Sequence, residues 1–423
     1  MRHKVTALGL MGIAAPAVWA QSWIAQPSGT TASLRGVSAV SAAVVWASGT
    51  GGTYLRTLDG GAMWRAAMVP GAGDRDFRGV HALDSQTAWL MSSGPGAQSS
   101  IYKTADGGAH WSLLFTNPDA GGFFDALAFW DAHRGILLGD PVDGQFVVMT
   151  TEDGGQSWQR RKLPPALPNE GAFAASNSCL VLRGKREAWF ATGGPSGARV
   201  FHSHDGGVNW TAAETPVRHD GAAAGIFSLA FAGALHGVAV GGDYGKPADA
   251  TGNVAVTADG GRTWTTPDGD RPRGYRSAVA FLAGRKVWIA VGTSGSDISS
   301  DGKNWKPFDS GSYNAISSAA GDAVWAMGPG GRIGRLRFIV GQALGLRRPP
   351  RPPSSRLQSS IFGATCGSTG PAQAKGLPHY LCRTIRIAII LSDLFSGSAH
   401  TFRDWRPNRT KRWPRPAISR RPA

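Results

Sequence analysis

The sequence predicts an all-β protein, a seven-bladed β-propeller whose last blade is closed by the N-terminal strand. Two recurring patterns predict it. A phrase of the form Thr/Ser-x-Asp-Gly-Gly-x-x-Trp returns every 42–54 residues, and a short apolar strand precedes each copy. Self-similarity at this period indicates stacked supersecondary units, and four short strands per unit are typical of propeller blades.

The recurring phrase, the Asp box, is expected to build a tight turn. An Asp side chain accepts hydrogen bonds from backbone amides of its own turn, and the Gly pair supplies the positive φ angles that such a turn needs. The Trp that ends the phrase can bury its ring between units. We therefore assign a structural role to the six aspartates Asp59, Asp106, Asp153, Asp205, Asp259 and Asp301, the last of which lies in a copy one residue shorter.

The apolar strand has seven copies, one more than the Asp box. The copies are Val44–Trp46, Ala88–Leu90, Gly135–Leu137, Ala188–Phe190, Gly237–Ala239, Val287–Ile289 and Ala323–Trp325. Each unit thus has an inner strand A, strands B and C, an Asp-box turn and an outer strand D. The seventh unit lacks strand D, and Gln21–Ala25 resembles the outer strands of the others. We expect Trp23 to lie in the strand that completes this blade, because ring closure removes an exposed strand edge.

The chain divides into three parts: a signal peptide in residues 1–20, the propeller in residues 21–340 and a basic Pro/Arg-rich tail in residues 341–423. Arg2 and Lys4 precede an apolar stretch, Val5–Ala15, that is too short to span a bilayer. This pattern predicts export to the periplasm or secretion. Two interpretations of the tail stay open, a disordered segment or a frameshifted reading beyond the true stop.

The distribution of charge argues against nucleic acid as a partner. The formal net charge is +16, but residues 341–423 hold 13 Arg, 2 Lys and 2 Asp, a net +13, which leaves +3 for residues 1–340. We expect neither a metal nor another cofactor, because the histidines have no ligand spacing and the chain has no phosphate loop or dinucleotide fingerprint. No nucleophile elbow is present either, so no residue is assigned a catalytic role.

Candidate binding residues lie in the loops on the face opposite the Asp boxes, where binding residues more often gather. At the starts of inner strands these are Arg35, Arg78, Arg276 and Asn314, and in the loops Asp140, Asp143, Glu170, Asp243 and Tyr244. A basic arc that faces an acidic arc would suit a polar peptide. The alternative is that the carboxylates cap turns while the arginines pair locally.

The Asp boxes, the seven-unit count, the export signal and strand phrases such as Ala188-Trp189-Phe190 make residues 21–340 similar to the photosystem II stability/assembly factor-like (BNR/Asp-box repeat) propeller family. The resemblance implies an exported, non-catalytic scaffold that binds a protein or peptide partner, associated with a membrane, and we expect a monomer. It also implies a basic patch, for which Arg35, Arg78 and Arg276 are the candidates.

The competing hypothesis is a sialidase-like glycoside hydrolase. Arg35, Arg78 and Arg276 would then form a triad for the substrate carboxylate, with Tyr244, Glu170 and Asp140 as the reacting groups. We place this second, because sialidase propellers have six blades and an N-terminal arginine motif that this chain lacks. Carboxylates bonded into turns would count against the hydrolase, whereas two carboxyl groups about 5 to 10 Å apart in an open cleft would favour it.

Overall fold

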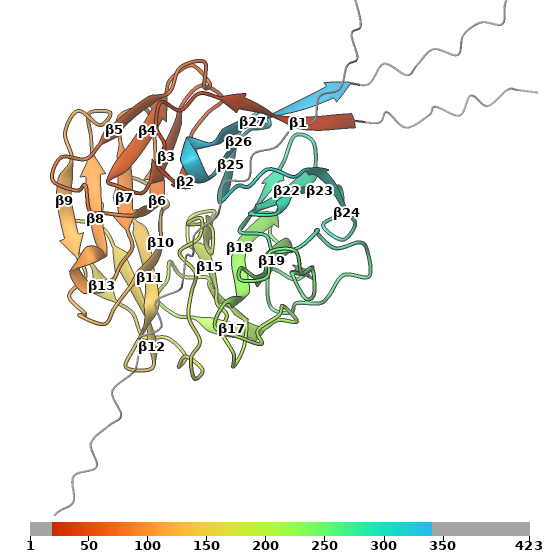
Figure 1. Cartoon of the computed structure of the whole chain (residues 1–423). Helices are drawn as coiled ribbons and strands as arrows, with labels where there is room; N and C mark the ends of the chain where they lie inside the picture. The colour runs from red at the N-terminus through yellow and green to blue at the C-terminus, as the bar shows by residue number, and fades with distance from the viewer. Residues whose placement is uncertain (1–18, 341–423) are drawn as a thin grey trace, which may run out of the picture. The chain divides into compact units, whose positions relative to one another are not determined.

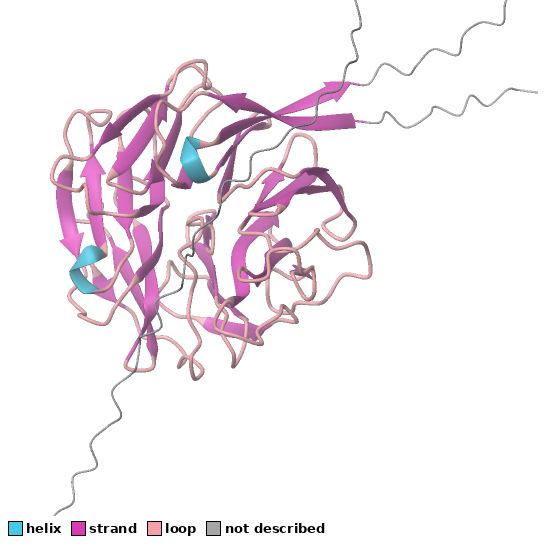
Figure 2. Ribbon diagram, in the orientation of Figure 1, coloured by secondary structure: helices cyan, strands magenta, loops and turns pink. Residues whose placement is uncertain are grey.

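A computed structural model describes residues 19–340, which form a closed ring of seven antiparallel sheets (Figure 1). Six sheets have four strands and one has three. The only helical segments among the described residues are two 3-10 turns, η1 Gly96–Gln98 and η2 Pro329–Gly331 (Figure 2). The predicted all-β, seven-bladed propeller is therefore confirmed. Within residues 19–340 no helix has the length and apolarity to cross a membrane.

The strands run from the inside to the outside of each blade. Blade 1 comprises β2 Leu34–Ala39, β3 Val45–Gly49, β4 Thr53–Thr57 and β5 Arg65–Met68. Blade 2 comprises β6 Phe77–Ala82, β7 Ala88–Ser92, β8 Ser100–Thr104 and β9 Ser112–Thr116. Blade 3 comprises β10 Phe124–Phe129, β11 Gly135–Val142, β12 Gln145–Thr151 and β13 Gln159–Arg160. Blade 4 comprises β14 Leu180–Arg183, β15 Glu187–Ala191, β16 Arg199–Ser203 and β17 Thr211–Glu214.

The remaining blades follow the same order, except that the last takes its outer strand from the N-terminal side. Blade 5 comprises β18 Ala224–Ala232, β19 His236–Asp243 and β20 Val254–Thr257. Blade 6 comprises β21 Ala278–Leu282, β22 Val287–Gly292, β23 Gly295–Ser299 and β24 Trp305–Asp309. Blade 7 comprises β25 Ala315–Ala319, β26 Ala323–Met327, β27 Ile333–Val340 and β1 Trp19–Gln26. All seven predicted apolar strands are the second strands of their blades.

Ring closure takes place in blade 7, as the sequence predicted. β1 pairs with β27 along its whole length, with Trp23 opposite Leu336 (Figure 1). The indole Nε1 of Trp23 donates to Ser296 Oγ in blade 6 at 2.9 Å, and its ring lies 5.4 Å from that of Tyr313. The strand begins two residues before the expected cleavage site. The rest of the expected signal peptide and the tail from residue 341 lie outside the described residues.

Each Asp box is held by the same short hydrogen bonds. In blade 1, Thr57 Oγ1 donates to Asp59 Oδ1 at 2.8 Å and accepts from the amide of Gly61 at 2.9 Å. Asp59 Oδ1 accepts in turn from the amide of Met63, and Gly60 and Gly61 have φ angles of 72° and 88°. The other five boxes repeat the arrangement from Thr104, Thr151, Ser203, Thr257 and Ser299. These bonds lower the pKa of all six carboxyl groups.

Tryptophans in the second strands tie neighbouring blades together. Trp89 in blade 2 donates from Nε1 to the carbonyl of Gly154 in the Asp box of blade 3 at 2.9 Å. Trp189 in blade 4 donates in the same way to Gly260 in blade 5. Both rings are buried. In these two pairs of blades the Asp box therefore contributes to the packing between blades as well as to the turn.

Two blades depart from the expected pattern. Blade 5 has no fourth strand: a single bridge joins Val256 to Thr265, and Pro267, which has no amide donor, follows two residues later. Blade 4 has a late inner strand, since β14 starts only at Leu180. The residues before it, 172–178, instead contact the inner strands of several other blades and help to shape the candidate site.

Candidate functional site

All seven blades contribute to a pocket of about 470 Å³ at the centre of the ring. Its walls come from the starts of the inner strands and the adjoining loops, so it lies on the loop face that the sequence indicated. Five of the predicted binding residues line it: Arg35, Arg78, Asp140, Tyr244 and Asn314. The sequence thus indicated the face on which this pocket lies, and it named about half of the polar residues that line the pocket.

The side chains that enter the pocket are placed by β-bulges in the inner strands. The register of β2 against β3 jumps between Leu34 and Gly36, which leaves Arg35 as the extra residue. In blade 2 the register of β6 against β7 jumps in the same way between Phe77 and Gly79, which leaves Arg78 as the extra residue. A bulge re-aims one side chain without changing the rest of the strand. Each bulge therefore turns its extra residue toward the centre of the ring, whereas the residues on either side stay in the sheet.

Two further pocket residues follow from the same device and escaped the sequence analysis. The bulge in blade 3 presents Asp125, and that in blade 5 presents Phe227. Both line the pocket. The signal that could have found them is a large apolar residue before the position and a small one after it, as in Phe124-Asp125-Ala126.

The expectation for Arg276 is wrong, because the strand that follows it is shifted by one residue. The amide of Ser277 bonds to the carbonyl of Val291, which is also opposite Ala278. Ser277 therefore occupies the bulge position, and Arg276 takes the preceding place. Its side chain is 1% exposed and donates to Asp297 Oδ2 at 2.6 Å. A one-residue shift sends a side chain to the other face of a strand. Of the three arginines of the predicted basic arc, only Arg35 and Arg78 therefore line the pocket.

Three of the predicted acidic residues lie outside the pocket lining. Glu170 is buried and accepts from Arg199 Nε at 2.9 Å. Asp243 accepts from the amide of Gly245 at 2.9 Å. Asp143 is exposed, with a φ of 54°, in the turn between β11 and β12. Glu170 and Asp243 thus pair locally or cap a turn, which is the alternative that the sequence left open.

The two arginines of the pocket share one acidic neighbour. Arg78 Nε donates to Asp76 Oδ2 at 2.7 Å, whereas Arg35 Nε is buried without a hydrogen-bond partner among the described residues. Burial, with Arg78 nearby, lowers the pKa of Arg35. Because an unpaired buried donor costs free energy, Arg35 is the group that gains most from an anionic or carbonyl ligand.

Asp125 and Asp140 form the acidic side of the pocket. Asp125 is 1% exposed, and its Oδ2 has no partner within residues 19–340. Burial, with the charge of Asp140, raises the pKa of Asp125 well above its ordinary value. Burial also raises the pKa of Asp140 to about 6, although Asp140 Oδ1 accepts from the amide of Ala172. The raised pKa values favour the protonated form of both carboxyl groups, which weakens the negative charge on this side of the pocket.

Aromatic rings supply the apolar part. Phe173 and Phe227 stack with centroids 3.9 Å apart, and Tyr275 meets Phe227 edge-on at 4.8 Å. Tyr244, 56% exposed, stands at the rim. Rings with few side-chain torsions present a rigid surface at low entropic cost. The pocket thus combines guanidinium groups, carboxyl groups with raised pKa values and aromatic faces.

The segment before β14 crosses the centre of the ring and forms part of the pocket wall. The side-chain amide of Asn177 bonds to the backbone of Leu127 in β10 as a neighbouring strand would. It accepts from the amide of Leu127 at 2.8 Å and donates to the carbonyl of Leu127 at 2.9 Å. Ser176 Oγ donates to the carbonyl of Ser277 in blade 6. These bonds hold residues 172–175 in place as part of the pocket wall.

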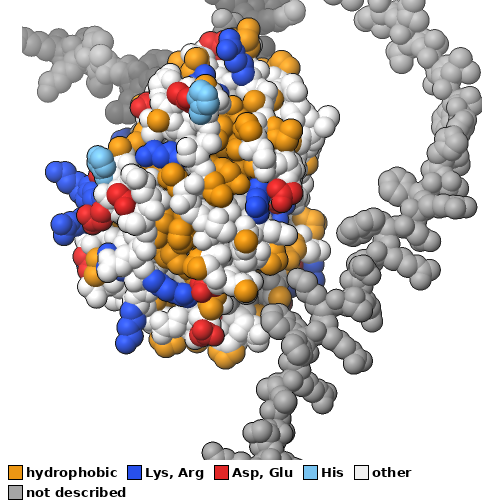
Figure 3. Space-filling view, turned by 90° about the vertical axis from the view of Figure 1, so that its left-hand side faces the viewer, with side chains coloured by type: hydrophobic (Ala, Val, Ile, Leu, Met, Phe, Trp, Pro, Cys, Tyr) orange, Lys and Arg blue, Asp and Glu red, His pale blue; other side chains and the backbone are white. Residues whose placement is uncertain are grey.

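Acidic and basic side chains are mixed on the face of the protein that Figure 3 shows. Apolar side chains are interspersed among them. This mixture agrees with the near-neutral charge of residues 1–340.

Comparisons with known proteins agree with this fold. The sequence profile of the photosynthesis system II assembly factor YCF48 family matches residues 120–333, just over half of the chain. No curated protein matches significantly. A solved structure of YCF48 bound to a D1 peptide is 17% identical, covers 74% of this chain and 96% of its own, and superposes with a TM-score of 0.53.

Two other solved structures are similar. YCF48 from Cyanidioschyzon merolae is 17% identical over 74% of this chain and 98% of its own, with a TM-score of 0.52. The Niastella koreensis GH74 enzyme is 16% identical over 70% of this chain and 50% of its own, with a TM-score of 0.50. At these identities the superpositions show a shared fold. Through the profile match, the chain belongs to the photosynthesis system II assembly factor YCF48 family.

Proposed function

We propose that this protein is an exported, non-catalytic, monomeric scaffold that binds a peptide segment of a membrane-associated protein partner in the central pocket. The observation that carries the proposal is the unpartnered, buried Nε of Arg35 in a pocket with aromatic walls. A peptide offers the matching chemistry, since a carboxylate or carbonyl group accepts from the guanidinium while an apolar side chain lies against the rings of Phe173 and Phe227.

The comparison with a peptide-bound relative supports the same conclusion. A YCF48 of the same fold has been solved with a D1 peptide. Here the ligand is a segment with an acidic group next to an apolar residue, because both arginines and the rings line one pocket. The raised pKa of Asp125 favours its protonated form, and a protonated carboxyl group donates a second hydrogen bond to a carbonyl or carboxylate of the ligand.

Photo-crosslinking in the host organism tests the proposal. A benzophenone side chain replaces Tyr244 at the pocket rim, 56% exposed, and in a matched control it replaces Leu113 on an outer strand, 54% exposed. We expect a partner to be crosslinked from position 244 alone, and Arg35→Ala to reduce its yield at least tenfold. Identical products from both positions, or a yield that Arg35→Ala leaves unchanged, would refute the pocket as the binding site.

A glycoside hydrolase is the second candidate, and the Asp125–Asp140 pair is the observation in its favour. Two buried carboxyl groups, one with a pKa of about 6, meet the general requirement for an acid and its partner. The sialidase version is contradicted, because Arg276 is buried against Asp297 and cannot join Arg35 and Arg78 on one substrate carboxylate. Assays with fluorogenic aryl glycosides and xyloglucan should show no hydrolysis; activity that Asp140→Asn abolishes would make the protein an enzyme.

A further inference from the structure

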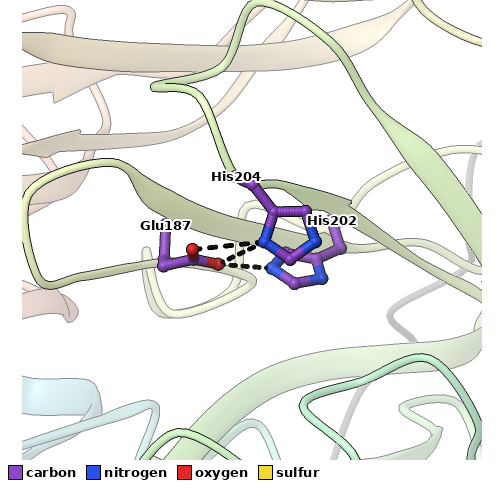
Figure 4. Close-up of side chains that lie close together, drawn as sticks. All are labelled: Glu187, His202 and His204. Carbon is purple, nitrogen blue, oxygen red and sulfur yellow. Dashed lines mark hydrogen bonds and ion pairs between the residues drawn. The ribbon is translucent and has the colours of Figure 1, made fainter.

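Three potential metal ligands meet in blade 4, at the end of the blade that carries its Asp box. Glu187 begins β15, His202 lies near the end of β16, and His204 follows in the Asp-box turn. Their ligand atoms all lie within 4.8 Å of one another. Glu187 Oε2 is 2.7 Å from His202 Nε2 and 3.0 Å from His204 Nδ1, and both imidazole rings converge on the carboxylate (Figure 4).

The fold brings these residues together although the sequence spacing concealed them. β15 and β16 are antiparallel neighbours, with Trp189 opposite His202, so the start of one strand meets the end of the other. His202 in β16 and His204, just after the end of that strand, then face the same carboxylate. The sequence analysis found no ligand spacing because Glu187 comes from the preceding strand.

One histidine is fixed and the other is accessible. The ring of His202 stacks on Trp189 with centroids 4.4 Å apart and is 6% exposed. The side chain of His204 is 56% exposed, and its ring centroid lies 4.0 Å from that of His202. The packed ring gives the cluster a preformed part, and the exposed ring can adjust to a ligand that arrives from solvent.

We propose that Glu187, His202 and His204 bind a divalent transition-metal ion of the zinc type. Two imidazole nitrogens and one carboxylate oxygen are ligands that Zn²⁺ accepts, with bonds of about 2.0–2.1 Å. In a tetrahedral site such bonds place the donor atoms about 3.3 Å apart, so the two distances from Glu187 Oε2 to the imidazole nitrogens, 2.7 and 3.0 Å, need only a small increase. Ca²⁺ and Mg²⁺ do not fit, because they take oxygen ligands.

The three protein ligands leave a coordination position for water or for a side chain of another molecule. A hollow of about 220 Å³ adjoins the cluster, lined also by Asp259, Arg183 and Arg262. The positive charges of the two arginines disfavour cation binding, whereas the negative charges of Asp259 and Glu187 favour it. Arg262 donates to the carbonyl of Asp259 at 3.4 Å, which holds one guanidinium to the neighbouring turn. Imidazole coordination rather than acidic charge therefore decides which ion binds.

Zinc titration of the chelator-treated full-length protein, followed by calorimetry at pH 7.5, tests the proposal. His204→Ala removes the exposed ligand and leaves the packed ring in place. His110→Ala is the matched control, since His110 is an exposed histidine whose Nδ1 lies 2.6 Å from Asp106 Oδ2 without a third ligand. Cys366, His379 and Cys382 are further residues of metal-binding type and are present in every variant. The test therefore compares zinc binding between the variants.

We expect His204→Ala to lose one equivalent of zinc or to bind it at least tenfold more weakly, and His110→Ala to behave as the wild type. Glu187→Gln, which keeps the side chain's shape, should also weaken binding because it removes the anionic oxygen. Zinc should raise the unfolding temperature of the wild type and His110→Ala, and not that of His204→Ala. Equal zinc affinity and stoichiometry in the wild type, His204→Ala and Glu187→Gln would overturn the proposal and leave a hydrogen-bonded cluster only.

Discussion

Trp23 lies opposite Leu336 in the antiparallel pair of β1 and β27, and this pairing closes the ring of blades. Its indole donates to Ser296 of blade 6 at 2.9 Å, so one residue joins the first described strand to the last and to the adjacent blade. A ring of seven wedges is complete only when this strand is in place, because otherwise blade 7 presents an unpaired edge.

Trp23→Ala should lower the free energy of unfolding by about 3 kcal/mol, because it removes a large ring that packs on Tyr313 and Phe308. Ile24→Ala in the same strand is the control. Its side chain is 45% exposed, so its effect should stay below about 0.5 kcal/mol. Denaturant unfolding measures both, and equal effects would mean that the strand is not docked as described.

Arg276 and Asp297 should prove to be a stability pair rather than part of the binding site. Both side chains are almost fully buried, so Arg276→Ala leaves an uncompensated charge and should cost about 3–5 kcal/mol. The double variant Arg276→Met/Asp297→Leu should recover most of that loss in a thermal unfolding experiment. A stable Arg276→Ala protein with weakened ligand binding would instead show that all three arginines of the predicted basic arc bind the ligand.

The Asp boxes should make the protein sensitive to strong acid. Hydrogen bonds within the turn lower the pKa of Asp205 from 3.8 to about 2, so its contribution to stability is fully present above pH 4 and is lost as pH falls toward 2. Asp205→Asn should flatten this part of the pH profile. Unfolding curves between pH 5 and 2 measure it; an unchanged slope in the variant would show that the carboxylate does not stabilise the turn.

Asp140 should change the pH dependence of folding stability in the opposite direction to the Asp boxes. Burial raises its pKa from 3.8 to about 6, so the folded state loses stability as pH rises through this range. Asp140→Asn keeps the acceptor for Ala172 and should match the wild type near pH 3.5, then exceed it by about 1–2 kcal/mol above pH 6.5. His81, with a pKa lowered by burial to about 4, titrates with the opposite sign, so the difference between the two proteins must be compared. A constant difference across this range would contradict the raised pKa.

The sequence predicted the blades because repeated turns and strands have local causes. The Asp box depends on contacts within a few residues, and its copies reveal themselves by repetition. The missing outer strand of blade 5 was not foreseen, since the phrase before it is complete and only the proline at position 267 indicates the break. The closing strand could be identified because the seventh blade lacked an outer strand and the segment Gln21–Ala25 resembled an outer strand that belonged to no other blade.

The site was harder to predict because it depends on single-residue register. Arg35 and Arg276 both follow a large apolar residue and precede a small one, yet the bulge lies at Arg35 in one blade and at Ser277 in the other. Asp125 was missed for the same reason. The wall formed by residues 172–178 depends on contacts with distant blades, such as that between Asn177 and Leu127, which no local pattern records.

Peptide selection tests the central claim most directly. A positional-scanning library of dodecapeptides is presented to the wild type, to Arg35→Ala, and to Arg65→Ala, which removes the same charge from the exposed outer strand β5. We expect the wild type and Arg65→Ala to select the same peptides, with an acidic group beside an apolar residue, and Arg35→Ala to bind them at least tenfold more weakly. Equal affinity of all three proteins for the selected peptides, or no selection by the wild type, would contradict the account.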